Sequence, residues 1–337
     1  MKAFLPTIKA GVLAATLSLA CLGVAAPVAA QEMVKGNGGK IRMLYVESGT
    51  TSYLIHAFKK FALDKKYNIE IVPTPNPTTT TAVVAMQGGS AELANFGWND
   101  LSRYQQGGYS VVGVTPWLRW GADFYLVAAD SPIKAVSDLK GKKIGTSSKV
   151  TLNYVLLKAV AKDNFNLDLD KDAQVYEGAQ PLLRGLAEQG QIDVAGMFNS
   201  VSPAMIATGK FRSFMKVSEL VSMYGLPDTP YLFWSFDGKY AKANPENVKA
   251  YVRMYQDAIQ ILKTNDEVWL ERGRELQQTD DVTRLFMDAA RTDLILKFDE
   301  NTEKNIQIIF DKFLPIAGKE AFGIDKLTPG YITSEYQ

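Results

Sequence analysis

The sequence has very little histidine and cysteine, with one of each among 337 residues. One histidine, His56, cannot by itself form a histidine metal cluster or a relay between imidazoles. It adjoins Lys59 and Lys60, so we expect it at the surface. The single cysteine, Cys21, lies in an N-terminal segment that we expect to be removed. The remaining chain then has no thiol, which excludes disulfides, thiol catalysis and thiolate metal sites.

The N-terminus has the pattern of a secretory signal peptide. Two lysines precede an apolar run over residues 10–26, and small residues lead up to Ala30. The apolar run is short and polar residues follow at once, which argues against a membrane span. A lipid-modified cysteine would need a leucine three residues earlier, where Ser18 stands. We therefore expect residues 1–30 to be cleaved and the protein to lie in the periplasm.

Neither sign of charge is in excess. The chain has 37 Lys and Arg against 36 Asp and Glu, a formal net charge of +1. Removal of residues 1–30 takes away two lysines and changes the net charge to −1. A nucleic-acid partner or an anionic membrane would call for a basic surface, so we expect neither.

Two short motifs resemble functional sites but are incomplete. The aspartates of Asp168–Asp172 are spaced like the start of a calcium loop, yet Ala173 takes the required Gly position and Ala179 the bidentate Glu position. Ser131 and Lys134 match an acylation motif whose companion motifs are missing. We therefore expect a solvated loop and a turn here, with no metal and no cofactor.

Strand-prone apolar runs alternate with helical patterns along the chain. Examples are Ile41–Val46, Leu93–Phe96 and Ile192–Gly196, each followed by a polar loop and then a helical segment. Strands that alternate with helices predict an α/β fold with mainly parallel sheets. The chain is long enough for one or two lobes with sizeable cores.

The pattern occurs twice. Residues 39–52 lead from Gly-Lys-Ile through a Ser/Thr-rich loop into a helix, and residues 141–151 do the same. Likewise, GSAELANFGWN at residues 89–99 resembles GQIDVAGMFN at residues 190–199. The sequence thus predicts two similar lobes with a ligand cleft between strand ends.

Two apolar runs are candidates for the passages between the lobes. Phe124–Val127 precedes the second copy of the pattern, and Tyr231–Phe236 follows it. We therefore expect residues 31–125 and 231–337 to form lobe 1, with a helical C-terminal tail. Residues 126–230 would form lobe 2.

Three segments resemble one known family. Asp130–Gly145, Gly185–Arg212 and Tyr240–Asn265 are similar to periplasmic substrate-binding proteins of ABC importers, of the nitrate/sulfonate/taurine (NitT/TauT) type, and to thiamine-precursor binders. The chain departs from the family after the Ile-Asp strand, where Phe198 replaces a Trp or Tyr and Pro203 comes later than the usual proline. The resemblance implies a type II two-lobe α/β periplasmic binding protein.

The same resemblance implies a function. Such a protein captures a small polar or anionic organic compound, such as a sulfonate, a carboxylate, a nitrate-like ion or an aromatic acid, by closing its lobes. It then delivers the compound to a permease and its ATPase at the inner membrane. We expect a monomer without enzyme activity, although a lobe-swapped dimer stays open. Two alternatives are a lyase-type enzyme on the same fold and a solute sensor for a membrane receptor.

The resemblance places the ligand where loops of both lobes meet. The candidate ligand-binding residues are Ser48, Gly49, Thr50, Thr51, Trp98, Asn99, Arg119, Thr146, Ser147, Ser148, Thr151, Phe198, Asn199 and Trp234. The alternative role of the Ser and Thr residues is helix capping. Arg119 could bind a carboxylate or sulfonate, or stack on Trp117 or Trp120 at the surface. Trp234 could equally be a core residue.

Overall fold

The computed structural model describes residues 34–45, 49–76, 79–119, 123–198 and 201–337. The predicted signal peptide, Ser48 and Asn199 lie outside these ranges. Val34–Gln337 forms one compact unit. Within the part of the chain that is described, no helix has both the length and the apolarity needed to cross a membrane.

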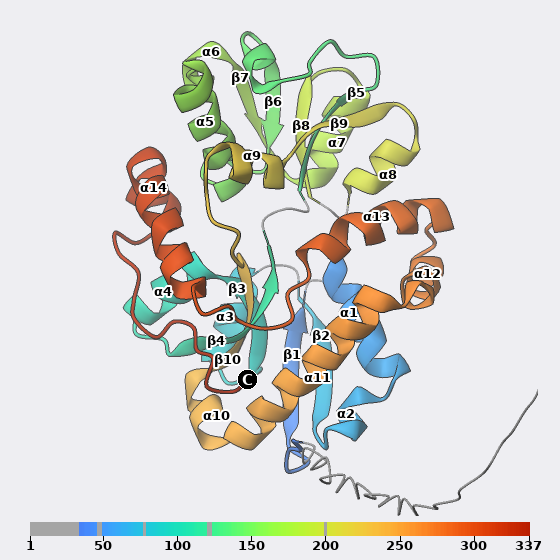
Figure 1. Cartoon of the computed structure of the whole chain (residues 1–337), viewed down its shortest axis with the longest axis vertical. Helices are drawn as coiled ribbons and strands as arrows, with labels where there is room; N and C mark the ends of the chain where they lie inside the picture. Colours follow the sequence, from blue (N-terminus) through green and yellow to red (C-terminus); the bar gives the residue numbers. More distant parts are fainter. Residues whose placement is uncertain (1–33, 46–48, 77–78, 120–122, 199–200) are drawn as a thin grey trace, which may run out of the picture. The chain divides into compact units, whose positions relative to one another are not determined.

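In the described ranges, ten strands form two five-stranded sheets (Figure 1). The first sheet has the order β2-β1-β3-β10-β4, and β10 runs antiparallel to both of its neighbours. Its strands are β1 (Lys40–Tyr45), β2 (Glu70–Pro75), β3 (Leu93–Gly97), β4 (Val111–Leu118) and β10 (Leu232–Asp237).

The second sheet repeats the plan of the first. Its order is β7-β6-β8-β5-β9, and β5 is the strand that runs antiparallel to its neighbours. Its strands are β5 (Phe124–Ala128), β6 (Lys143–Thr146), β7 (Gln174–Glu177), β8 (Val194–Met197) and β9 (Phe211–Lys216). The two-copy prediction is confirmed, because β1 and β6, and likewise β3 and β8, take the same places in the two sheets.

The chain passes between the sheets twice. After β4 it enters the second sheet with β5, and after β9 it returns to the first sheet with β10. Phe124 and Tyr125, which the predicted division assigned to the first lobe, pair with β8 and β9 in the second sheet. We call residues 119–123 and 217–231 the crossover segments.

Helices follow most strands and cover the sheets. The helices between strands of the first sheet are α1 (Thr50–Lys60), α2 (Leu63–Lys66), α3 (Thr79–Gln87) and α4 (Trp98–Gln106). Those after β5 are the 3-10 turn η1 (Val136–Leu139), α5 (Leu152–Phe165), α6 (Leu169–Asp172), α7 (Gln180–Glu188), α8 (Ser202–Ala207) and α9 (Val217–Met223).

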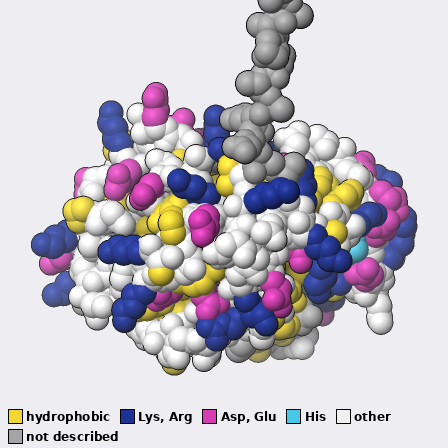
Figure 2. All heavy atoms as spheres, turned by 90° about the horizontal axis from the view of Figure 1, so that it is seen from below, with side chains coloured by type: hydrophobic (Ala, Val, Ile, Leu, Met, Phe, Trp, Pro, Cys, Tyr) yellow, Lys and Arg dark blue, Asp and Glu magenta, His cyan; other side chains and the backbone are white. Residues whose placement is uncertain are grey.

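The C-terminal part is helical, as predicted. It comprises α10 (Gly238–Ala243), α11 (Pro245–Thr264), α12 (Asp266–Glu275), α13 (Asp280–Asp293) and α14 (Thr302–Phe322). Proline occupies the first turn of α11, where its missing N–H costs no hydrogen bond. Gly318, with φ 76°, kinks α14. Figure 2 shows one face on which basic and acidic side chains are interspersed, as a net charge near zero predicts.

Indole rings fill the core beside the first sheet. Trp117, Trp234 and Trp269 are 0% exposed and belong to one cluster. The rings of Trp117 and Trp234 lie 5.8 Å apart, and Tyr255 packs edge-on against Trp117 at 6.0 Å. The structure therefore places Trp234 in the core and not at an open ligand surface, because its position in β10 turns the side chain to the covered face of the sheet.

We expect Gly273→Ala to destabilise the protein by about 1–3 kcal/mol, because small-to-large changes in packed sites cause overpacking. A Cβ at Gly273 on α12 would lie 2.0 Å from Thr283 Oγ1 on α13. The matched control is Gly185→Ala on α7, where a Cβ meets nothing within 4 Å. That change should stabilise the helix by about 0.5–1 kcal/mol. Urea denaturation measures both, and equal effects of the two variants would contradict the close contact.

Candidate functional site

Four strand-to-helix junctions carry most of the predicted site residues. In the first sheet, β1 leads to α1 and β3 leads to α4; in the second sheet, β6 leads to α5 and β8 leads to α8. The carboxyl ends of parallel strands lie at the same edge of a sheet, so each sheet presents two junctions on one edge. None of the four helices has a side-chain hydrogen bond at its N-cap.

The first junction is glycine followed by three buried hydroxyl residues. Gly49 has φ 74°, a conformation that glycine adopts without the strain a side chain would add. Thr50, Thr51 and Ser52 are 2–6% exposed and form the first turn of α1, which contains no acidic residue. The positive end of α1 thus has no carboxylate of its own to balance it.

The second junction contains an unsatisfied acceptor. Asn99 Oδ1 is buried, and the described residues supply no hydrogen-bond partner for it. It lies 2.6 Å from where a Cβ at Gly97 would stand, and the ring of Tyr231 lies 3.2 Å from the same point. Burial raises the pKa of the neighbouring Asp100 carboxyl, and Arg103, at 2.6 Å, opposes that rise. A buried acceptor without a partner is costly, so this position suits a donor group from a ligand or water.

Trp98, in the same junction, faces the core. Its side chain is 0% exposed, stacks on Phe322 at 5.8 Å and meets Phe310 edge-on at 6.2 Å. Both phenylalanines belong to α14, which the sequence did not connect with this loop. The structure therefore places Trp98 among core aromatics instead of in the predicted ligand wall.

The third junction is held by its own hydroxyl groups. The Oγ1 atoms of Thr146 and Thr151 donate hydrogen bonds to the carbonyl oxygen of Ser148, at 3.3 Å and 2.8 Å. Ser148 Oγ accepts a hydrogen bond from the backbone N–H of Val150 at 3.4 Å. Thr151 is the N-cap residue of α5, yet its side chain does not cap the helix. These hydroxyls fold the loop, and the first-turn N–H groups of α5 have no side-chain cap. Ser147, between them, is partly exposed.

The fourth junction is fixed by a glutamine that the sequence did not suggest. Gln180 Oε1 accepts a hydrogen bond from the backbone N–H of Phe198 at 2.9 Å, and its Nε2 donates to the Gly196 carbonyl at 3.4 Å. Phe198 itself is 41% exposed. Its ring is thus available for contact, in contrast to Trp98 and Trp234. The position of Gln180 just before a proline at the start of α7 was the only signal for this role.

Arg119 forms an ion pair within the protein. Its Nε donates to both carboxylate oxygens of Asp228, at 2.7 Å and 2.9 Å, and this pair joins the two crossover segments. The described aromatic rings include no stacking partner for Arg119. Its guanidinium is therefore already engaged, which weakens the prediction that it binds a ligand anion directly. Sequence patterns gave no signal for Asp228, since it lies 109 residues away.

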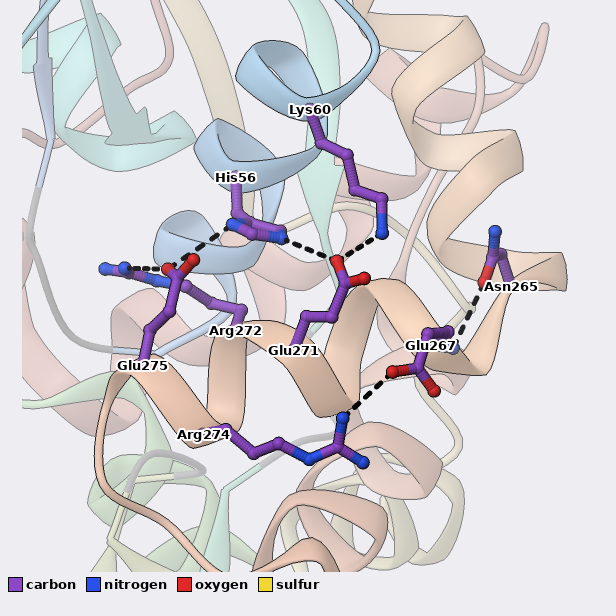
Figure 3. A network of polar contacts seen from close by, with 8 residues as sticks. All are labelled: His56, Lys60, Asn265, Glu267, Glu271, Arg272, Arg274 and Glu275. Carbon is purple, nitrogen blue, oxygen red and sulfur yellow. Dashed lines mark hydrogen bonds and ion pairs between the residues drawn. The ribbon is translucent and has the colours of Figure 1, made fainter.

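A charged network fixes α1 to α12 (Figure 3). Arg272 Nε donates to Ser52 Oγ at 2.8 Å and Arg272 also pairs with Glu275. His56 lies between Glu271 and Glu275 at 3.5 Å from each, and Lys60 pairs with Glu271. The His56 side chain is 14% exposed, so it lies at the surface as predicted (Figure 2), although most of it is covered by this network. The network holds the first turn of α1, and with it Thr50 and Thr51.

The described residues contain no group of three or more His, Cys, Asp or Glu side chains placed to hold a metal ion. The aspartates of Asp168–Asp172 are used locally, since Asp168 caps α6 and Asp170 pairs with Lys158. The predicted solvated loop is wrong, because these residues form helix α6 and its N-cap.

Comparison with known proteins identifies relatives. The sequence profile of the NMT1/THI5-like family matches residues 63–267, more than half of the chain. The taurine-binding periplasmic protein of Escherichia coli (strain K12) is 27% identical over 146 residues, which is 43% of this chain and 43% of that protein. The matched segment therefore spans less than half the length of this relative.

Solved structures share the fold. The periplasmic aliphatic sulphonate binding protein SsuA from Escherichia coli superposes with a TM-score of 0.70 at 19% identity, over 86% of this chain and 95% of that chain. The alkanesulfonate-binding protein SsuA from Xanthomonas axonopodis pv. citri, bound to MOPS, gives 0.68 at 18% identity, over 87% and 98%. These likenesses confirm the predicted two-lobe periplasmic binding protein fold.

We expect Trp98→Ala to cost about 3–5 kcal/mol in the free energy of unfolding, because it leaves a cavity beside Phe310 and Phe322. Trp98→Phe keeps an aromatic ring and should cost less. Urea denaturation measures both variants. A Trp98→Ala protein with unchanged stability that no longer binds its ligand would restore the predicted ligand wall.

We expect the Glu271→Gln variant to be less stable than the parent protein at pH 7, with a smaller difference in stability at acid pH. A hydrogen bond from Lys60 holds the pKa of the Glu271 carboxyl below its ordinary value. A carboxyl with a lowered pKa stabilises the fold above its unfolded-state pKa, and this contribution disappears as the pH falls through the folded-state value. Denaturation at pH 7 and at acid pH measures the difference. The control is Glu300→Gln, which removes no ion pair between described residues, and a gap of unchanged size in acid would contradict the assignment.

Proposed function

Because the chain belongs to the NMT1/THI5-like family, we propose that it is the solute-binding component of an ABC importer. It binds a small anionic organic compound at the strand-to-helix junctions of both lobes. It then presents the compound to a membrane permease and its ATPase. The taurine-binding and sulfonate-binding relatives named above support a sulfonate as the ligand class, and a carboxylate carries the same charge.

The observation that carries this proposal is the uncapped state of the junction helices. The N-cap residues of α1, α4 and α5 make no side-chain capping hydrogen bond, and α1 and α5 have no acidic residue in the first turn. Backbone N–H groups and the helix dipole together attract anions. In a protein without a ligand role, Ser, Thr, Asp or Asn would ordinarily cap such ends.

The binding free energy indicates which contacts must contribute besides the helix dipoles. A dissociation constant of about 1 μM corresponds to about −8 kcal/mol. Each helix dipole supplies about 0.3–1 kcal/mol, so the junctions cannot provide this energy through dipoles alone. With Trp98 and Trp234 in the core, direct hydrogen bonds from backbone N–H groups and contact with Phe198 must supply the remainder. The unsatisfied Asn99 Oδ1 favours a ligand that also carries a donor group.

The proposed mechanism is a population shift. A ligand that contacts junctions of both lobes binds the closed arrangement better than the open one, and so increases the closed population. The permease would recognise that closed form. In this proposal the protein acts in the periplasm, after removal of residues 1–30, as a monomer and without chemical change to the ligand.

We expect a thermal-shift screen of residues 31–337 to give a hit among alkyl and aromatic sulfonates and carboxylates. Ligand at about 100 times its dissociation constant stabilises a protein by about 2.7 kcal/mol. Asn99→Ala should weaken the hit roughly fivefold, because one hydrogen bond to a buried acceptor contributes about 1 kcal/mol. The matched control is Asn301→Ala, since the Asn301 side chain makes no capping hydrogen bond.

Mass spectrometry of the recovered compound separates the classes of function. An unchanged compound supports a transport receptor. A chemically altered compound would favour the lyase-type enzyme on the same fold. Absence of any hit in the sulfonate and carboxylate panel would contradict the proposed ligand class.

A further inference from the structure

A cavity of about 400 Å³ lies beside Arg119, the crossover segment 217–231 and helices α13 and α14. We call it the hinge cavity. The residues that matter for its chemistry are Arg119, Phe124, Lys216, Leu226, Thr229 and Ala289. Cavities that hold small molecules in proteins are commonly about 300–1,000 Å³, so the hinge cavity is large enough for one. Apart from Arg119, its described lining includes none of the candidate residues at the four strand-to-helix junctions.

The lining of the hinge cavity contains two polar groups that lack a hydrogen-bond or ion-pair partner among the described residues. Thr229 is 3% exposed, and its Oγ1 has no hydrogen-bond partner among the described residues. Lys216 Nζ forms no ion pair with any described carboxylate and lies 5.9 Å from the centroid of the Phe124 ring. Lys216 is an exposed residue. A buried hydroxyl without a partner and an ammonium group without a counter-ion, both in the lining of one cavity, favour an anionic acceptor there.

The other charges of the lining are already engaged. Asp228 accepts two hydrogen bonds from Arg119, and the backbone N–H of Arg119 donates to the carbonyl oxygen of Asp293 at 3.1 Å. The Asp293 side chain is 3% exposed and makes contacts of its own. Lys216 is therefore the charged group of the lining that lacks a counter-ion among the described residues.

A further part of the lining is apolar, and its Phe124 ring lies beside Lys216. Phe124 and Leu226 are 6% and 8% exposed, and Ala289 of α13 adds a small side chain. An ion such as chloride or sulfate would leave this apolar part in contact with water. A compact hydrocarbon body would cover it and gain hydrophobic energy in proportion to the area buried.

We propose that the hinge cavity is a second small-molecule site, and that it takes an organic monoanion with a compact apolar body. Lys216 and Thr229 bind the anionic head group, and Phe124, Leu226 and Ala289 enclose the body. An occupant contacts β5, β9 and the crossover segment 217–231 at once. This site is separate from the strand-to-helix junctions, so a test of it does not depend on the function proposed above.

The test is isothermal titration of residues 31–337 with benzoate as the probe. Acetate has the charge without the apolar body, and benzyl alcohol has the body without the charge. We expect benzoate to bind at least tenfold more tightly than either. Lys216→Gln should weaken benzoate binding roughly tenfold, because it removes a charge-assisted hydrogen bond. Lys210→Gln is the matched control, since this exposed lysine of the same lobe is not in the lining.

Two further variants separate binding from folding. Thr229→Val keeps the shape and removes an unpartnered hydroxyl, so it should lower benzoate affinity without lowering stability. Ala289→Leu should block the cavity and abolish benzoate binding while the helix is preserved. Asn99→Ala, at the junctions, should leave unchanged the benzoate binding that Lys216→Gln weakens, and any benzoate binding at the junctions should respond to Asn99→Ala alone. The proposal is overturned if Lys216→Gln and Ala289→Leu bind benzoate as the parent does, or if no binding occurs up to about 10 mM.

Discussion

The backbone pairing of two antiparallel strands is the constraint on which the rest of this structure depends. β10 hydrogen-bonds to β3 and β4, and β5 hydrogen-bonds to β8 and β9. Each of these two strands directly follows one passage of the chain from one sheet to the other. Pairing on both sides buries these strands and fixes where both crossover segments begin and end. The four junctions, the Arg119–Asp228 pair and the hinge cavity all take their positions from that arrangement.

Burial of aromatic side chains limits what the ligand site can use. Trp98 and Trp234 lie at or near strand ends, yet both are 0% exposed because α14 and α11 with their aromatic partners cover them. Indole burial contributes several kcal/mol to stability, which exceeds what an exposed ring at the junction would add to ligand contact. The junctions are left with backbone N–H groups, hydroxyls, Asn99 and Phe198.

The charged and polar groups also divide into those that have a partner within the protein and those that do not. Arg119 binds Asp228, and His56 lies within the α1–α12 network beside Glu271 and Glu275. These contacts position segments of the protein. Lys216 and Thr229, in contrast, have no such partner among the described residues, and they lie in a cavity. Groups with satisfied partners hold the architecture together, and groups without them are the better candidates for binding.

The sequence by itself determined the α/β class, the repeated plan and the helical C-terminus, because period-2 and period-3.6 patterns and glycine-terminated helices are local properties of the chain. It also located the four junctions, since each follows a strand directly. Only the tertiary structure decided which side chains of those junctions face outward. Trp98 meets residues of α14 more than 200 positions later, Arg119 meets Asp228, and Gln180 holds Phe198. Such contacts depend on packing between distant segments, which no local pattern encodes.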